Sequence, residues 1–136
     1  MESISPEAKI LNEYRTVAVV GASPNRERPS YRVVSYLSEH GYVVIPVNPL
    51  VQEIAGLTSY PDISSIPEKV EVVDIFRSSK EVRPIVEEAI RIGAKAVWMQ
   101  EGIINEEAAS TARDAGLLVV MDKCMRKEHL RLTERG

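Results

Sequence analysis

The sequence has few of the residues that mark several large classes of protein. Its 136 residues include one cysteine and two histidines, and its 17 Lys and Arg do not exceed its 20 Asp and Glu. A single cysteine cannot form an internal disulfide, and the first residues lack the pattern of a secretory leader, so we expect a cytoplasmic protein. One cysteine and two widely separated histidines do not favour a metal site. The lack of a basic surplus disfavours a nucleic-acid binder, and the lack of an apolar run near the ~20 residues that span a bilayer disfavours a membrane protein.

Five short apolar runs are spaced along the chain. Apolar residues make up 44% and charged residues 27% of the sequence, which suits one globular domain over residues 1–136. Continuous apolar runs, rather than alternating ones, are typical of strands in a parallel sheet covered on both faces. The expected strands are Thr16–Val20, Tyr42–Val47, Val70–Phe76, Ala94–Met99 and Leu117–Met121.

Helical patterns alternate with these strands. We expect helices from Ser30, over residues 82–90, after Asn105, and at residues 6–13 and 123–132. Three of them are followed by a glycine and then a strand, at Gly41, Gly93 and Gly116, which indicates repeated units of helix and strand. Right-handed crossovers then predict an α/β, Rossmann-like, doubly wound sheet of three layers. We expect the strands, numbered along the chain, in the order 3-2-1-4-5. Residues 51–67 are expected to form a loop with a small strand near residues 58–60.

The loop after the first strand carries the strongest chemical signal. It starts at Gly21 and leads into a helix, so its backbone N–H groups can face an anion. It is not the usual dinucleotide fingerprint, because Ser23 and Arg26 stand where glycines would be needed, and Asn48 stands where an acidic residue would bind a ribose. NAD is therefore disfavoured. Arg26 and Arg28, with Arg77 at the same rim of the sheet, favour a ligand with more phosphate charge.

Five segments resemble a known family of small, stand-alone CoA-binding proteins. They are residues 19–23, 41–49, 72–77, 97–102 and 122–125, in order along nearly the whole chain. The family's fold is similar to the CoA-binding domain of succinyl-CoA synthetase α subunits. The resemblance implies a domain that holds coenzyme A, or an acyl-CoA, at the strand ends.

The resemblance also implies which residues form the site. The loop of Gly21, Ala22, Ser23 and Arg26, together with Arg28 and Ser30, would hold phosphates. Val47, Asn48 and Pro49 would border the nucleotide, Phe76 and Arg77 would close the other side, and Gln100 belongs to the fourth of the similar segments.

Catalysis by this chain alone is not expected. The synthetases use a phosphorylated histidine and an ATP-grasp domain, whereas His40 and His129 lie at no expected strand end. Cys124 is expected to be a buried structural cysteine, although it follows a strand and lies near cations that could activate it. Asp74 and Asp122 are expected to be hydrogen-bonded supports, and Trp98 a core residue with a bonded N–H.

Two other functions remain open from the residues. One is an enzyme that binds NADP through Arg28 or Arg77, and the other is an interaction subunit of a split acyl-CoA synthetase. A homo-oligomer or a protein partner is compatible with either, and the acyl group is not indicated.

Overall fold

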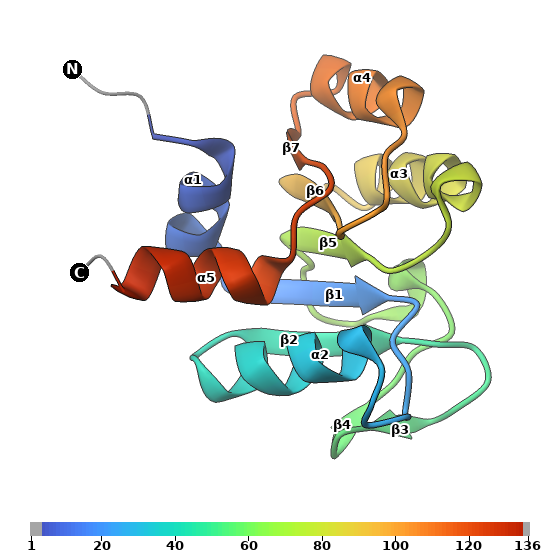
Figure 1. Ribbon diagram of the computed structural model, residues 1–136. Helices are drawn as coiled ribbons and strands as arrows, with labels where there is room; N and C mark the ends of the chain where they lie inside the picture. The colour runs from blue at the N-terminus through green and yellow to red at the C-terminus, as the bar shows by residue number, and fades with distance from the viewer. Residues whose placement is uncertain (1–3, 135–136) are drawn as a thin grey trace.

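A five-stranded parallel sheet forms the centre of the protein (Figure 1). The computed structural model describes residues 4–134. All adjacent strands run parallel, and β5 and β6 are buried along their whole length, which confirms strands covered on both faces. The strands are β1 (Thr16–Val20), β2 (Val43–Val47), β5 (Val72–Ile75), β6 (Ala96–Met99) and β7 (Leu118–Val120).

Helices cover both faces of this sheet and complete the expected three layers. On one face, Ile10, Val33 and Met125 of three helices pack in one apolar cluster with the strands. On the other face, Val86 and Ala108 belong to the second cluster. The first group is α1 (Pro6–Glu13), α2 (Pro29–Glu39) and α5 (Met125–Glu134), and the second is α3 (Val82–Arg91) and α4 (Glu106–Asp114).

The ends of the helices follow from particular residues. The Asn105 side chain accepts a hydrogen bond of 2.9 Å from the Ala108 N–H and so caps α4. Gly41, Gly93 and Gly116 have φ between 80° and 90° and reverse the chain into the next strand. The repeated joint between helix and strand predicted from the sequence is confirmed.

The predicted order of strands is wrong. The observed order is β2-β1-β5-β6-β7, or 2-1-3-4-5 when the five expected strands are numbered along the chain. The third expected strand, β5, lies beside β1 and not beside β2. Burial explains its place, because a strand that is buried on both faces needs a central position.

Pro46 explains why no full strand pairs with the outer edge of β2. The Pro46 carbonyl accepts a bond of 3.1 Å from the Tyr60 N–H at this edge, so the proline nitrogen, which has no hydrogen, faces the same way. In the part of the chain that the structure describes, a single bridge, between Val47 and Tyr60, forms there. Residues 48–71 otherwise contain the hairpin of β3 (Glu53–Ile54) and β4 (Leu57–Thr58) and a short 3₁₀ turn, η1 (Ile63–Ser65). The expected loop is confirmed, but in place of one small strand near residues 58–60 it holds two short strands over residues 53–58.

Candidate functional site

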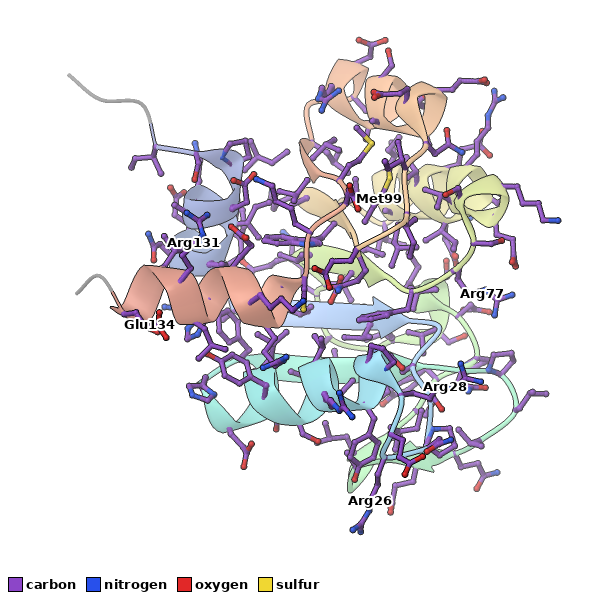
Figure 2. The ribbon with its side chains drawn as sticks, in the orientation of Figure 1. Arg26, Arg28, Arg77, Met99, Arg131 and Glu134 are labelled. Atoms are coloured by element: carbon purple, nitrogen blue, oxygen red, sulfur yellow. The ribbon has the colours of Figure 1, made fainter. Side chains whose placement is uncertain are left out.

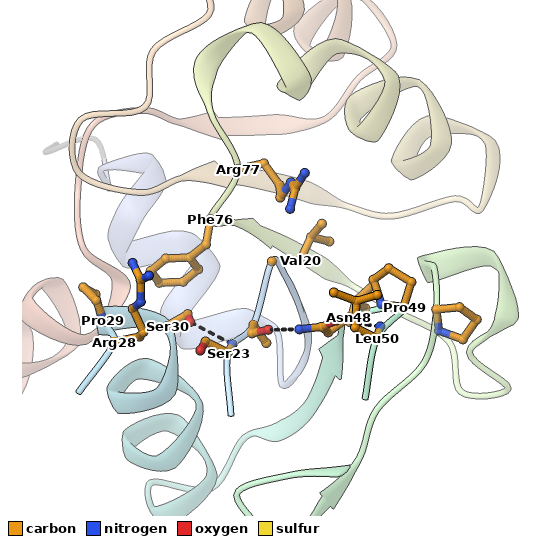
Figure 3. A pocket seen from close by; sticks show the side chains of 14 residues that line it. Val20, Ser23, Arg28, Pro29, Ser30, Asn48, Pro49, Leu50, Phe76 and Arg77 are labelled. Carbon is orange, nitrogen blue, oxygen red and sulfur yellow. Dashed lines mark hydrogen bonds between the residues drawn. The ribbon is translucent and has the colours of Figure 1, made fainter. Parts of the chain in front are cut away.

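A pocket of about 450 Å³ lies at the C-terminal ends of β1, β2 and β5. This edge of the sheet is where open α/β folds bind ligands. In Figure 3, Arg28 and Phe76 lie at one side of the pocket, Asn48, Pro49 and Leu50 at the other, and Arg77 above. The lining residues are Val20, Gly21, Ala22, Ser23, Arg28, Pro29, Ser30, Val47, Asn48, Pro49, Leu50, Pro61, Phe76 and Arg77.

Gly21 sets the path of the chain from β1 into the pocket wall. Its φ is +84°, and a Cβ at this position would lie 2.5 Å from the carbonyl oxygen of Phe76 and 3.0 Å from Cδ of Arg77. Both the conformation and the space require glycine. The Gly21 N–H donates to the Val47 carbonyl at 3.1 Å, so this residue holds the tips of β1, β2 and β5 together.

The loop between β1 and α2 uses most of its own N–H groups. Ser23 N–H donates to Ser30 Oγ at 3.0 Å, and the turn around Asn25 is closed by bonds from Glu27 N–H at 2.9 Å and Arg28 N–H at 3.0 Å. Among residues 4–134, the N–H groups of Ala22, Arg26 and Ser30 have no hydrogen-bond partner. The loop is therefore less rich in available N–H groups than its sequence predicts, but two of the three that remain, those of Ala22 and Ser30, belong to pocket-lining residues.

The N-terminus of α2 has no side-chain cap. Its N-cap residue is Arg28, which makes no capping bond, whereas Ser5 caps α1 and Asn105 caps α4. The first N–H groups of a helix carry partial positive charge and attract an anion when no cap satisfies them. Since Arg28, Pro29 and Ser30 all line the pocket, this helix end contributes to its wall.

Two guanidinium groups line the pocket, and they differ in whether they form an ion pair. Arg77 forms an ion pair with Glu81, whereas Arg28 forms no ion pair with any residue that the structure describes. Arg28 therefore offers an uncompensated charge beside an uncapped helix. A guanidinium fits a phosphate through two parallel hydrogen bonds.

Asn48 holds the two halves of the pocket together. Its Nδ2 donates to the Ala22 carbonyl at 2.8 Å, and its Oδ1 accepts from the Leu50 N–H at 2.8 Å (Figure 3). Both polar atoms are thus used inside the protein. An acidic side chain here could not donate to the Ala22 carbonyl, which gives a structural reason for the amide.

Ten of the twelve predicted binding residues line this pocket, and Arg26 and Gln100 do not. Arg26 points away from Arg28 and Arg77 in Figure 2 and lines a different hollow. Gln100 is buried, and its Oε1 accepts from the Met125 N–H at 3.2 Å, so it joins the end of β6 to the start of α5. Sequence reasoning missed Val20, Pro29, Leu50 and Pro61. The position of Leu50 just after Asn48-Pro49 is the one signal for its place at the pocket.

A second hollow of about 440 Å³ adjoins the first. The two share Val20, Val47, Pro61 and Arg77. The second extends toward η1 and α3, where Ile63, Pro84 and Ile85 give it a more apolar wall. The charged residues Asp62, Lys80, Glu81 and Glu88 complete its lining. Together the two hollows offer a polar and an apolar compartment to one ligand.

Among residues 4–134, no histidine, cysteine, aspartate or glutamate lines the first pocket. His40 ends α2, with its Nδ1 2.6 Å from the Tyr36 carbonyl, as expected for a residue that supports a helix end. His129 lies on α5, with Nδ1 2.7 Å from the Tyr36 hydroxyl. Cys124 is buried in the apolar cluster under α5, as expected for a structural cysteine. Within the described chain, no group of three His, Cys, Asp or Glu could hold a metal ion, and no helix is long and apolar enough to cross a membrane.

Asp122, one of the two expected supports, and Trp98, the expected core residue, make the bonds that the sequence predicts. The Asp122 carboxylate accepts from the Gly102 N–H at 2.7 Å, and the buried Trp98 donates its indole N–H to the Lys123 carbonyl at 2.8 Å. For Asp74 the prediction is wrong. Its carboxyl oxygens are buried without a hydrogen-bond partner in residues 4–134, and burial raises the pKa of Asp74 well above its usual range, which favours the neutral acid.

Comparison with known proteins places this geometry in a family. The model of a CoA binding domain matches residues 15–130. A structure described as a hypothetical protein from Pyrococcus horikoshii OT3 is 45% identical, with a TM-score of 0.90, and the match covers 98% of this chain and 99% of that one. The uncharacterized protein YneT of Bacillus subtilis is 33% identical over 121 residues, which are 89% of this chain and 90% of that protein.

Larger proteins contain a similar segment. The alpha subunit of the ADP-forming acetate–CoA ligase II of Pyrococcus furiosus is 33% identical over 122 residues, or 82% of this chain. The match spans 27% of that subunit's length. The CoA binding domain model covers most of the chain, and the protein belongs to the CoA binding domain family.

Proposed function

We propose that the protein binds coenzyme A, or an acyl-CoA, at this pocket without catalysing a reaction on it. Coenzyme A carries a pyrophosphate and a 3′-phosphate, which need several positively polarised groups. The uncapped N-terminus of α2, the N–H groups of Ala22 and Ser30, and the unpaired guanidinium of Arg28 provide them at one pocket. Family membership supports the same ligand.

The rest of the proposed site follows from the two hollows. Phosphates lie between the β1–α2 loop and Arg28, while Arg77, between the hollows, exchanges its bond with Glu81 for one to the ligand. The apolar wall of Ile63, Pro84 and Ile85 accommodates a less polar part of the molecule.

The observation that carries the proposal is the uncapped helix beside an unpaired arginine. The experiment is a set of thermal melts with coenzyme A, dephospho-CoA, NADP and NAD, each added separately. A ligand at 100 times its dissociation constant stabilises the folded protein by roughly 2.7 kcal/mol. We expect stabilisation by coenzyme A. Stabilisation by NADP alone would replace the proposal with a nucleotide-dependent enzyme.

Arg28→Ala tests the residue assignment. Losing one charge-assisted bond costs on the order of 1.5–3 kcal/mol, so we expect affinity for coenzyme A to fall at least about tenfold. Arg113→Ala is the matched control, because Arg113 is an exposed arginine on α4, which lines neither hollow. A larger loss for coenzyme A than for dephospho-CoA assigns Arg28 to the 3′-phosphate, and equal losses assign it to the pyrophosphate. Affinities equal to those of the control would remove Arg28 from the site.

The absence of catalysis has its own measurement. The protein is incubated with acetyl-CoA, and free thiol is followed with a thiol reagent. We expect no release above the rate without protein. Release that Arg28→Ala abolishes and Arg113→Ala retains would show an enzyme at this pocket.

A second candidate is a subunit that completes an acyl-CoA synthetase. It is favoured by the similarity to about a quarter of a ligase alpha subunit and by Leu50, which is 89% exposed at the pocket. Tagged protein is incubated with lysate of its source organism, and the captured fraction is assayed for ADP-forming acetate–CoA ligation. Activity that depends on the tagged chain supports this candidate, and its absence from the captured fraction counts against it.

A further inference from the structure

A third hollow, of about 500 Å³, lies between α2 and the first turn of α5. We call it the arginine hollow, because Arg26, Arg32 and Arg126 line it together with Tyr31 and Tyr36. It shares no lining residue with the two hollows at the strand ends. A ligand in it would therefore occupy a separate site.

The positive charge of the arginine hollow exceeds its negative charge. None of its three arginines forms an ion pair or a side-chain hydrogen bond with another described residue, in contrast to Arg77 and Arg83, which both pair with glutamates. Glu39 is the one carboxylate in the lining. Three guanidinium groups line one open hollow in a chain of net charge −3, so this surface attracts an anion.

The aromatic wall of the hollow is held in place. The Tyr36 ring stacks on His40 with 4.0 Å between ring centroids, and its hydroxyl bonds to Nδ1 of His129 at 2.7 Å. Tyr31 is half-buried, and its hydroxyl has no hydrogen-bond partner in the part of the chain that the structure describes. A rigid wall with a free hydroxyl favours a ligand that adds a planar or polar group to its negative charge.

The turn around Asn25 connects this hollow to the first pocket. Bonds from Glu27 N–H to Asn25 Oδ1, at 2.9 Å, and from Arg28 N–H to the Asn25 carbonyl, at 3.0 Å, fix the chain between Arg26 and Arg28. One rigid turn thus presents Arg26 to the arginine hollow and Arg28 to the pocket. The two arginines that the sequence groups together belong to different sites.

We propose that the arginine hollow binds a second small anion that carries a di- or triphosphate group. Guanidinium groups recognise phosphoryl oxygens through paired hydrogen bonds, and three of them match several phosphoryl groups better than a single carboxylate. The polyphosphate can be free, or it can belong to a nucleoside polyphosphate. In the second case the base of the nucleoside contacts the side of the hollow that Tyr31 lines. Both sources share the chemistry that the arginines recognise.

The test is calorimetric titration of the full chain, first saturated with coenzyme A, with tripolyphosphate and separately with ATP, at low ionic strength. We expect both probes to bind, and Arg32→Ala or Arg126→Ala to weaken them at least about tenfold while affinity for coenzyme A stays the same. Arg126→Lys keeps the charge and loses the paired geometry, so it separates recognition from simple attraction. Circular dichroism and a thermal melt check that each variant folds. Tighter binding of ATP than of tripolyphosphate assigns a role to the ring, and equal binding assigns recognition to the phosphates alone.

Two controls separate this proposal from the proposed function. Arg28→Ala should weaken coenzyme A and leave both probes unchanged, and Arg113→Ala should change neither. Failure of coenzyme A to bind, with intact probe binding, would refute only the proposed function. Probes that compete with coenzyme A, that bind the Arg32 and Arg126 variants as well as the original chain, or that do not bind at millimolar concentration would refute the second site. So would a single-stranded RNA oligomer that binds when neither probe does.

Discussion

Replacing Gly21 with alanine tests whether the tips of β1, β2 and β5 meet as the site requires. The left-handed backbone at φ +84° costs alanine about 1–2 kcal/mol. The new Cβ would also lie 2.5 Å from the Phe76 carbonyl oxygen, which belongs to backbone and cannot rotate away. Forcing an extra carbon into a packed region costs typically 1–3 kcal/mol more. We therefore expect Gly21→Ala to lower the free energy of unfolding by about 2–5 kcal/mol.

Gly41→Ala is the matched control. Gly41 has φ +90°, and a Cβ there would meet no atom within 4 Å. Gly41→Ala therefore has the conformational cost alone, about 1–2 kcal/mol. The effect of alanine on the unfolded chain is the same in both variants. The difference between the two variants therefore isolates the contact with Phe76.

Urea unfolding followed by circular dichroism measures both free energies, and calorimetric titration measures coenzyme A affinity. We expect Gly21→Ala to lose stability beyond Gly41→Ala and to lose affinity as well, because the Ala22 N–H moves with the loop. If both variants lose the same stability and bind coenzyme A equally well, the close approach of Gly21 to β5 does not shape the pocket.

Two further predictions concern pH. Burial raises the pKa of Asp74, so the folded state binds a proton more tightly than the unfolded chain, and stability should fall as pH rises above about 4, the ordinary value for aspartate. Asp74→Asn should remove this fall in urea midpoints between pH 4.5 and 7.5; an unchanged slope would contradict it. Burial, with His40 and Arg15 nearby, lowers the pKa of His129, so the stability it contributes is complete above about pH 6.5 and is lost as pH falls below that value. His129→Gln should make the urea midpoint depend less on pH between pH 7 and 5. If the midpoint of the variant falls as steeply as that of the original chain, His129 does not have this role.

Much of the fold was predictable because its signals are local. The apolar runs, the cap at Asn105 and the glycines after three helices depend on a few neighbouring residues, and all are found where the sequence predicts them. Pro46 was a readable signal for an edge strand, since a missing N–H excludes a full ladder on one side. The predicted order of strands was nevertheless wrong. The neighbours of β5 in the sheet depend on how its two faces are buried by segments that are distant in the sequence.

The candidate site was predictable in outline for a similar reason. Parallel strands bring their C-terminal ends to one edge of the sheet. The residues that follow β1, β2 and β5 therefore lie near one another, regardless of which of these three strands is in the middle. The sequence could not separate Arg26 from Arg28, because the direction of each side chain depends on the turn around Asn25. Nor could it show that Gln100 turns inward to bond the Met125 N–H.

The sequence by itself determined the alternation of strands and helices, the glycine at the tip of β1 and the supply of arginines near it, since these follow from residue type and spacing. Only the tertiary structure decided which strand lies beside which, which N–H groups of the loop stay available, and that Asp74 is buried without a partner. The physical reason is that backbone geometry and periodic burial act over a few residues. The hydrogen-bond partners of polar groups and the orientation of charged side chains depend on groups that the fold brings together from distant parts of the chain.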